Sequence, residues 1–121
     1  RLRVISLTDN MPGILAWSND VSYESIFVEQ LKNLANPGDV LLALSGSGNS
    51  PNVLRAVDWA NAQGMITWGL TGFTGGRLIM KANHYLHVCS NDMGIVECVH
   101  LLICHHLVDM IKLHIDRRMA E

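Results

Sequence analysis

The segment from Ser45 to Ser50, with the sequence Ser-Gly-Ser-Gly-Asn-Ser, is rich in groups that can bind an anion. Its serine hydroxyls donate hydrogen bonds, and Gly46 and Gly48 leave backbone N–H groups unobstructed. Pro51 then starts an amphipathic stretch, so a helix would direct the positive end of its dipole at the segment. Because the segment contains no Lys or Arg, neutral donors suit a small phosphorylated metabolite better than a nucleic-acid backbone.

Two common phosphate-binding patterns do not fit this segment. A Walker loop ends in Gly-Lys-Ser or Gly-Lys-Thr, which is absent from the segment. The dinucleotide pattern needs a third glycine where Pro51 stands and an acidic residue after the next strand, which instead runs into Thr71 and Gly72. An ordinary strand-to-helix turn explains one glycine and one capping serine, but poorly explains this density of both. The sequence therefore predicts a loop that binds phosphate and disfavours NAD as its ligand.

The stretch from Ile95 to Arg118 predicts a long helix with several ionisable side chains among apolar ones. These side chains are Glu97, His100, His105, His106 and His114. Burial among apolar neighbours makes such groups candidates for proton transfer. Glu97 and His105 stand about 80° apart around a helix and about 12 Å apart along it, so they can lean toward one ligand but cannot touch. The spacing is not that of a helical zinc site, and we expect His100 to be packed and His114 to be solvated.

Strand-like and helix-like patterns alternate along the chain, which predicts an α/β fold with an open parallel sheet. Strands are expected at Val4–Leu7, Val40–Leu44, Met65–Leu70 and Tyr85–Val88. Helices are expected at Pro12–Trp17, from a capping Ser22 through Leu34, from Pro51 to a stop at Gly64, at Arg77–Lys81 and at Ile95–Arg118. The continuous apolar run at 40–44 predicts a strand buried on both faces, and the apolar residues all around the last helix are typical of burial between subunits.

Length and composition limit the class of protein. The chain of 121 residues predicts a single domain, residues 1–121. A hydrophobic content of 49% with 17% charged residues predicts apolar surface buried in an oligomer. A net charge of −2 provides no excess of positive charge for binding nucleic acid. We also expect no apolar run long enough to span a membrane. Three unpaired cysteines favour a reduced, cytoplasmic protein, and the start at Arg1 suggests a fragment.

Several blocks of the chain resemble the sugar isomerase (SIS) domain, in particular its phosphoheptose isomerase branch. The blocks are Leu7–Asn10, Asn19–Leu31, Pro37–Gly64 and Thr67–Leu78, in this order. The resemblance covers nearly the whole chain and implies a flavodoxin-like sheet flanked by helices, usually assembled as a homotetramer with active sites between subunits. It also implies that the amino-terminal part of the domain is missing, including a Gly-Gly-Ser phosphate turn and a helical His/Glu pair.

The resemblance assigns roles only to the residues that match. It implies that the segment 45–50 binds a sugar phosphate, with Ser45, Ser47, Asn49 and Ser50 as contacts and with Gly46 and Gly48 in the same binding loop. Asp9 falls where the family places an acidic residue near the sugar hydroxyls. His105 aligns with a histidine that acts as acid/base and, in some members, as a zinc ligand. Glu97 aligns with a glutamine that contacts substrate or metal, so it is a candidate catalytic residue and a candidate zinc ligand.

The implied activity is aldose–ketose isomerisation of a sugar phosphate such as sedoheptulose 7-phosphate, a step of carbohydrate metabolism. A base would remove a proton next to the carbonyl, and the resulting enediol would regain it on the neighbouring carbon. The alternative is a noncatalytic module that senses phosphosugars or scaffolds other proteins, as in a relative that associates with the replication initiator. His105 favours the enzyme. The departures, Gly46 for a threonine and Gly94 for an aspartate, favour the binding module.

Overall fold

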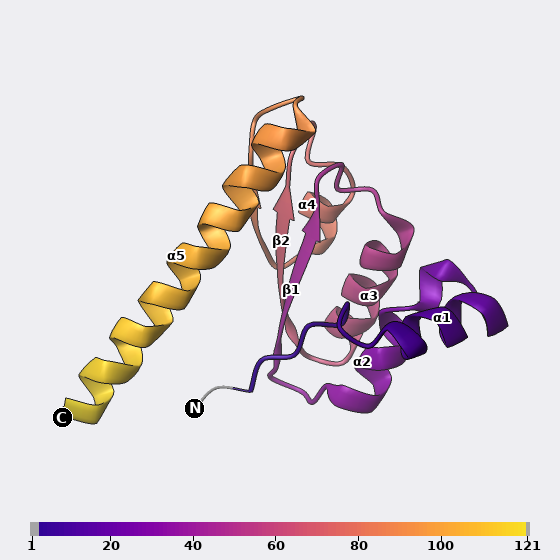
Figure 1. The fold of residues 1–121 in the computed structure, drawn as a ribbon, viewed down its shortest axis with the longest axis horizontal. Helices are drawn as coiled ribbons and strands as arrows, with labels where there is room; N and C mark the ends of the chain where they lie inside the picture. Colours follow the sequence, from indigo (N-terminus) through magenta and orange to yellow (C-terminus); the bar gives the residue numbers. More distant parts are fainter. Residues whose placement is uncertain (1–2, 121) are drawn as a thin grey trace.

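The computed structural model describes residues 3–120 (Figure 1). Its helices are α1 (Met11–Asp20), α2 (Val28–Leu34), α3 (Pro51–Ala62), α4 (Leu78–Lys81) and α5 (Met93–Ala120), with a 3-10 turn η1 (Tyr23–Ser25). Its strands are β1 (Val40–Ser45), β2 (Ile66–Thr71) and β3 (His84–His87). The boundaries lie close to the predicted ones from β1 onward.

The three strands form one parallel sheet in the order β1-β2-β3. Figure 1 shows the shorter helices on one side of this sheet and α5 on the other. In the strand register, Ser45, Thr71 and His87 stand side by side at the carboxyl edge. The predicted α/β class and parallel sheet are confirmed, and ligand-binding loops of such sheets lie at this edge.

The core lies between the sheet and α3. One buried cluster joins α3 to the sheet and α4 and contains Ala43, Leu54, Val57 and Leu78. A second joins α3 to α2 and contains Leu31, Ala56, Ala60 and Met65. The helix α3 ends as predicted, because Gly64 adopts a φ of +74° and the amide of Met65 returns to the carbonyl of Ala60 at 3.0 Å. This packing fixes α3 and therefore the loop that precedes it.

The prediction of a strand at Val4–Leu7 is wrong. The segment is irregular in the structure, with Val4 83% exposed and Ile5 51% exposed. A strand needs a neighbouring backbone to pair with, whereas this segment is held by a side chain: the amide Nε2 of Gln30, on α2, donates to the carbonyl of Leu7 at 3.0 Å. The segment is also tied to the start of β1, where Arg3 pairs with Asp39 at 3.3 Å, but it forms no strand.

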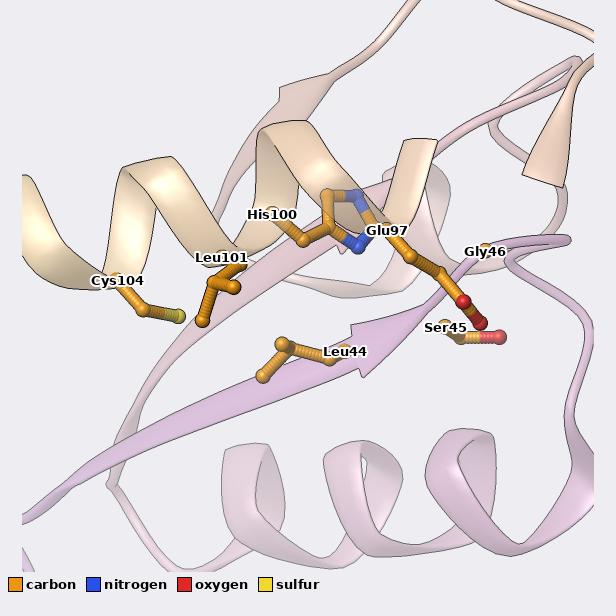
Figure 2. Close-up of a pocket in the computed structure, with 7 residues that line it drawn as sticks. All are labelled: Leu44, Ser45, Gly46, Glu97, His100, Leu101 and Cys104. Carbon is orange, nitrogen blue, oxygen red and sulfur yellow. The ribbon is translucent and has the colours of Figure 1, made fainter. Parts of the chain in front are cut away.

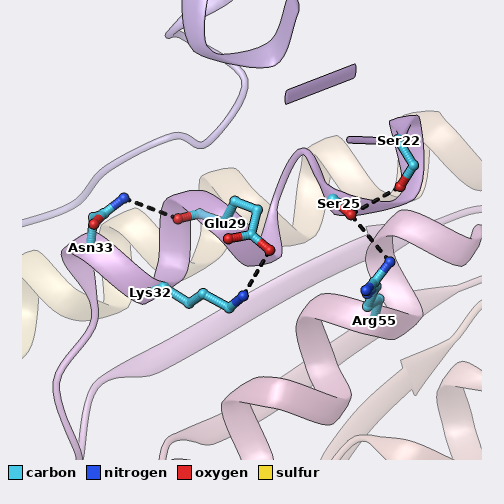
Figure 3. Close-up of polar contacts among 6 residues, drawn as sticks. All are labelled: Ser22, Ser25, Glu29, Lys32, Asn33 and Arg55. Atoms are coloured by element: carbon cyan, nitrogen blue, oxygen red, sulfur yellow. Dashed lines mark hydrogen bonds and ion pairs between the residues drawn. The ribbon is translucent and has the colours of Figure 1, made fainter. Parts of the chain in front are cut away.

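The prediction of one helix capped by Ser22 is also wrong, because that region contains η1 and α2 as separate elements. The hydroxyl of Ser22 lies 2.9 Å from the hydroxyl of Ser25 and makes no cap to the backbone. Ser25 is fully buried and accepts a hydrogen bond from Arg55 of α3 at 3.1 Å (Figure 3). The helix α2 starts only at Val28, after Ser25 has made this contact with α3, and it carries an ion pair between Lys32 and Glu29 at 2.7 Å on its surface.

One face of the sheet is open in the chain, contrary to the prediction of a β1 buried on both sides. Leu42 and Leu44 are 38% and 44% exposed, because α5 contacts only the end of this face and then leaves it (Figure 1). The helix is likewise not buried on several sides: Val96 and His100 are buried, whereas most apolar residues beyond them are exposed. Nothing in residues 3–120 covers these two surfaces.

The helix α5 also corrects the expectation that no segment reaches membrane-spanning length. The helix between Met93 and Met119 is long enough to cross a membrane and contains an 18-residue window with a mean hydropathy of 1.5, so it passes the test of length and composition. The reason is that no Asp, Glu, Lys or Arg lies between Glu97 and Asp109. Length and composition alone are weak evidence, since core helices pass the same test.

Candidate functional site

The serine loop, residues 45–50, connects β1 to the amino end of α3. The hydroxyls of Ser45 and Ser50 lie 3.0 Å apart and close the loop, and the amide of Gly48 donates to the carbonyl of Ser45 at 3.0 Å. Pro51 occupies the start of α3 as predicted, and Ser50 stands at the N-cap without a side-chain hydrogen bond to the helix. The amino end of α3 therefore directs its dipole at a loop of neutral donors.

A second glycine-rich turn, residues 72–77, packs directly against the serine loop. The amide of Gly72 donates to the carbonyl of Gly46 at 2.7 Å. The amide of Leu78 donates to the carbonyl of Gly48 at 2.9 Å. Gly48 has a φ of +66°, and a Cβ on it would overlap the carbonyl oxygen of Gly75. Gly48 thus permits the approach of two backbones as well as a left-handed turn.

Asn49 connects the two turns through both ends of its side-chain amide. Its Nδ2 donates to the carbonyl of Ser47 at 3.1 Å, and its Oδ1 accepts from the amide of Arg77 at 3.0 Å. The hydroxyl of Ser47 accepts from the amide of Asn49 at 3.2 Å. Asn49 is exposed, but both ends of its side-chain amide are hydrogen-bonded to backbone groups, so in this structure the amide stabilises the conformation of the loop.

A hollow lies between the end of β1 and the first turns of α5 (Figure 2). Its lining consists of Leu44, Ser45, Gly46, Glu97, His100, Leu101 and Cys104. The carboxylate of Glu97 points toward Ser45 and Gly46 in Figure 2. The structure therefore brings three of the predicted site residues together: Ser45, Gly46 and Glu97.

His100 forms the inner wall of this hollow, where it is 5% exposed. Its Nε2 lies 3.2 Å from the carbonyl oxygen of Thr71, and because a carbonyl only accepts, this nitrogen donates. The prediction that His100 is packed is confirmed. The hydrogen bond fastens α5 to the end of β2 and thereby positions Glu97, one turn earlier on the helix.

The other predicted residues lie outside the hollow. His105 is exposed, since it follows Cys104 and a step of one residue turns a helix by about 100°. Asp9 is exposed and lines a separate hollow near Asn10 and Gln30. Ser47 is exposed on the outer part of the serine loop. In the structure, Ser45, Gly46 and Glu97 of the predicted site line one hollow, whereas His105 and Asp9 lie outside it.

Sequence reasoning did not assign four residues to the site, namely His100, Cys104, Thr71 and Met93. Cys104 and His100 share the helix face of Glu97, which the spacing of three and seven residues would have shown. The buried hydroxyl of Thr71 has no hydrogen-bond partner among the described residues and stands beside Ser45 in the sheet. Met93 occupies the space beside Gly46, where a Cβ would lie 2.6 Å from its Sδ. Met93 therefore takes up room that a larger residue at position 46 would need.

The structure offers no complete metal site within residues 3–120, because no three His, Cys, Asp or Glu side chains come together there. Glu97 and His105 lie on different faces of α5, so they do not converge on one ion in this structure. The described residues alone do not fit a zinc ion.

Comparison with known proteins shows which family has this arrangement. The family model described as the SIS domain matches residues 2–72, which include the serine loop. The chain belongs to the SIS domain family. The resemblance inferred from the sequence blocks is confirmed, and so is the fold that it implied.

Relatives of this SIS domain include several phosphoheptose isomerases. That of Maridesulfovibrio salexigens is 40% identical over 87% of the chain, which covers 53% of the relative's length. That of Shewanella loihica is 42% identical over 98% of the chain, which covers 59% of the relative's length. The solved structure of the phosphoheptose isomerase from Neisseria gonorrhoeae superposes with a TM-score of 0.87 at 32% identity, over 89% of this chain and 60% of that one. The chain thus spans between half and two thirds of these relatives, and the similarity extends into α5.

The contact between the two glycine-rich turns predicts a large effect of Gly48→Ala. The substitution strains a left-handed residue and also forces the Gly75 backbone away, so the free energy of unfolding should fall by more than about 3 kcal/mol. Gly38→Ala and Gly64→Ala are matched controls, because both have positive φ with open space around them, and each should cost only about 1 kcal/mol. Urea unfolding of the full-length protein measures all three. Equal losses would show that the two turns do not depend on their close contact.

Proposed function

We propose that the full-length protein is an isomerase that converts a phosphorylated sugar between its aldose and ketose forms, with a heptose such as sedoheptulose 7-phosphate as substrate. The observation that carries the proposal is the hollow in which Glu97 faces the serine loop at the amino end of α3. The similarity to phosphoheptose isomerases along most of the chain supports the sugar class. A cytoplasmic location is part of the proposal, supported by three cysteines that form no disulfide within the described residues.

In this proposal the phosphate binds at the serine loop. Hydrogen bonds are donated by the hydroxyls of Ser47 and Ser50 and by backbone amides, and the positive end of the α3 dipole adds electrostatic attraction. Glu97 then lies on the sugar side of the phosphate, where its carboxylate accepts hydrogen bonds from sugar hydroxyls. Asn49 contributes by holding the loop against the second turn.

The reaction moves a proton between two neighbouring carbons. A base removes the proton from the carbon next to the carbonyl while the carbonyl oxygen is protonated, which gives an enediol. The carbon proton then returns to the former carbonyl carbon as the neighbouring hydroxyl gives up its own proton and becomes the new carbonyl. We assign His105 as one acid/base group, which requires the substrate to reach the flank of α5 where His105 is exposed. In this proposal Asp9 contacts the sugar hydroxyls from its separate hollow, which requires the substrate to extend toward that hollow.

Zinc binding through Glu97 and His105 stays a prediction. It requires further ligands from outside residues 3–120, since those residues hold no group of three metal-binding side chains. No step of the proposed reaction depends on the ion.

A noncatalytic phosphosugar-binding or scaffolding module is the second candidate. The position of His105 outside the hollow favours it, as does Gly46, where Met93 takes the space of a larger side chain. Both candidates share phosphate binding at the serine loop, and turnover separates them.

Phosphate binding is tested with the double variant Ser47→Ala, Ser50→Ala. Each hydroxyl that donates to a charged oxygen is worth about 1.5–3 kcal/mol, so the affinity for sedoheptulose 7-phosphate should fall at least tenfold. Titration calorimetry on the full-length protein measures the change. Ser18→Ala, on α1 and in the lining of neither hollow, is the control and should bind normally. An unchanged dissociation constant in the double variant would remove the loop from the phosphate site.

Proton transfer is tested with His105→Asn in the full-length protein. Loss of an acid/base group should reduce turnover of phosphorylated heptoses by about 10²–10⁴-fold, with little change in thermal stability because His105 is exposed. His106→Asn is the matched control, since His106 is the exposed neighbour on another face of α5. Equal rates in both variants would exclude His105 from the mechanism. No turnover by the unmodified protein would favour the binding module.

We also propose that the protein is a homotetramer that binds neither nucleic acid nor membrane. The exposed apolar residues of α5 and of the open sheet face support association, and the net charge of −2 supports the exclusion of nucleic acid. The similarity of α5 to the corresponding part of phosphoheptose isomerases favours a protein interface over a membrane span.

Association through α5 is tested with Leu107→Glu together with Ile111→Glu. Both residues are exposed in the chain, at 39% and 41%, so charges there should leave the fold intact but prevent burial in an interface. Native mass spectrometry should show a smaller assembly. His106→Glu adds charge at another exposed position of α5 and is the control. An unchanged assembly in the double variant would contradict the proposed interface, and recovery of the unmodified protein with membranes would contradict the exclusion of a membrane.

A further inference from the structure

The junction between β3 and α5 carries a thiol and an imidazole that the proposed isomerisation does not use. The Sγ of Cys89 lies 3.8 Å from the Nδ1 of His87, within the range of a sulfur hydrogen bond. Cys89 is exposed, whereas His87 is half-buried at the last position of β3. Neither residue lines the hollow that contains Glu97.

The imidazole of His87 is oriented by a third group. Its Nε2 lies 2.9 Å from the carbonyl oxygen of Phe73, which can only accept, so Nε2 carries the proton. In the neutral ring, Nδ1 then presents its lone pair, and this is the nitrogen that faces the thiol. The arrangement of a nucleophile, a base and a group that orients the base is typical of activated cysteines.

The orienting carbonyl is itself held in place. Phe73 has a φ of +49°, which is uncommon for a residue with a side chain, and its amide donates to the carbonyl of Ser90 at 2.9 Å. The loop that carries Cys89 therefore also fixes the turn that orients His87. The thiol, the base and the carbonyl are coupled across two neighbouring segments, residues 87–90 and the turn at Phe73.

We propose that Cys89 is a reactive thiol that exchanges with low-molecular-weight disulfides, with His87 as its base. The proton of the thiol passes to Nδ1 of His87, and the thiolate attacks one sulfur of the disulfide. A new S–S bond to Cys89 forms while the S–S bond of the reagent breaks, and the departing thiolate takes up the proton. The products are a mixed disulfide on the protein and one free small thiol, and the reverse exchange restores Cys89.

Cys98 provides an internal comparison. It is also free and exposed, but it lies on α5, and no imidazole hydrogen-bonds to its sulfur within residues 3–120. Exposure alone predicts similar reactivity for the two thiols. The contact with His87 predicts that Cys89 reacts faster.

The experiment uses full-length protein with Cys98→Ser and Cys104→Ser, which leaves Cys89 as the only thiol among residues 3–120, and oxidised glutathione as the probe. Its second-order rate constant at pH 7 should exceed that of Cys98, measured in a Cys89→Ser, Cys104→Ser variant, by about tenfold. Adding His87→Gln, which keeps an N–H donor for Phe73 but provides no base, should remove this advantage. Equal rates for Cys89 and Cys98, or a rate unaffected by His87→Gln, would overturn the proposal.

A second measurement does not depend on the folding of any variant. The unmodified protein is treated briefly with oxidised glutathione, and the modified peptides are quantified by mass spectrometry. Glutathione should accumulate on Cys89 ahead of Cys98 and should be released by a reducing thiol. Preferential modification of Cys98 or Cys104 would refute the assignment independently.

Discussion

Close contact between two backbones at the carboxyl edge of the sheet is the constraint on which the candidate site depends. Gly48 passes so near Gly75 that neither segment has room for a side chain between them. The hydrogen bonds of Asn49 and of the Gly48 carbonyl then fix the relative position of the two turns. The serine loop is consequently shaped before any ligand arrives, which lowers the entropic cost of binding a phosphate.

Local patterns were sufficient to predict the part of the fold that forms this edge. The apolar run of β1, the Pro51 start of α3 and the Gly64 stop are set by neighbouring residues, and the structure has all three. The segment Val4–Leu7 has an equally good strand pattern. Its conformation depends instead on Gln30 of α2, a contact that periodicity does not encode.

The candidate site could be predicted only in part, for the same physical reason. The residue types of the serine loop indicate anion binding, and the resemblance pointed to Glu97, which does face the loop. The engagement of Asn49 with Arg77 joins residues 28 positions apart and had no local signal. His105 was assigned from the resemblance alone, whereas the helical spacing from Glu97 selects His100 and Cys104 as the neighbours on the same face.

The way in which α5 is attached has a consequence for motion. The helix has 28 residues, but its contact with the sheet is confined to the first turns, through the side chain of Val96 and the hydrogen bond of His100. Beyond that anchor, the hydrogen bonds of the helix are supported by little tertiary packing in the chain, and a helix without packing is marginally stable in water. In a chain without partner subunits, protection of its backbone amides from solvent exchange therefore declines from the anchored end toward Met119, whereas burial in the proposed interface would restore it. The anchored end carries Glu97, so the acid group beside the serine loop stays in place even when the far end of the helix opens.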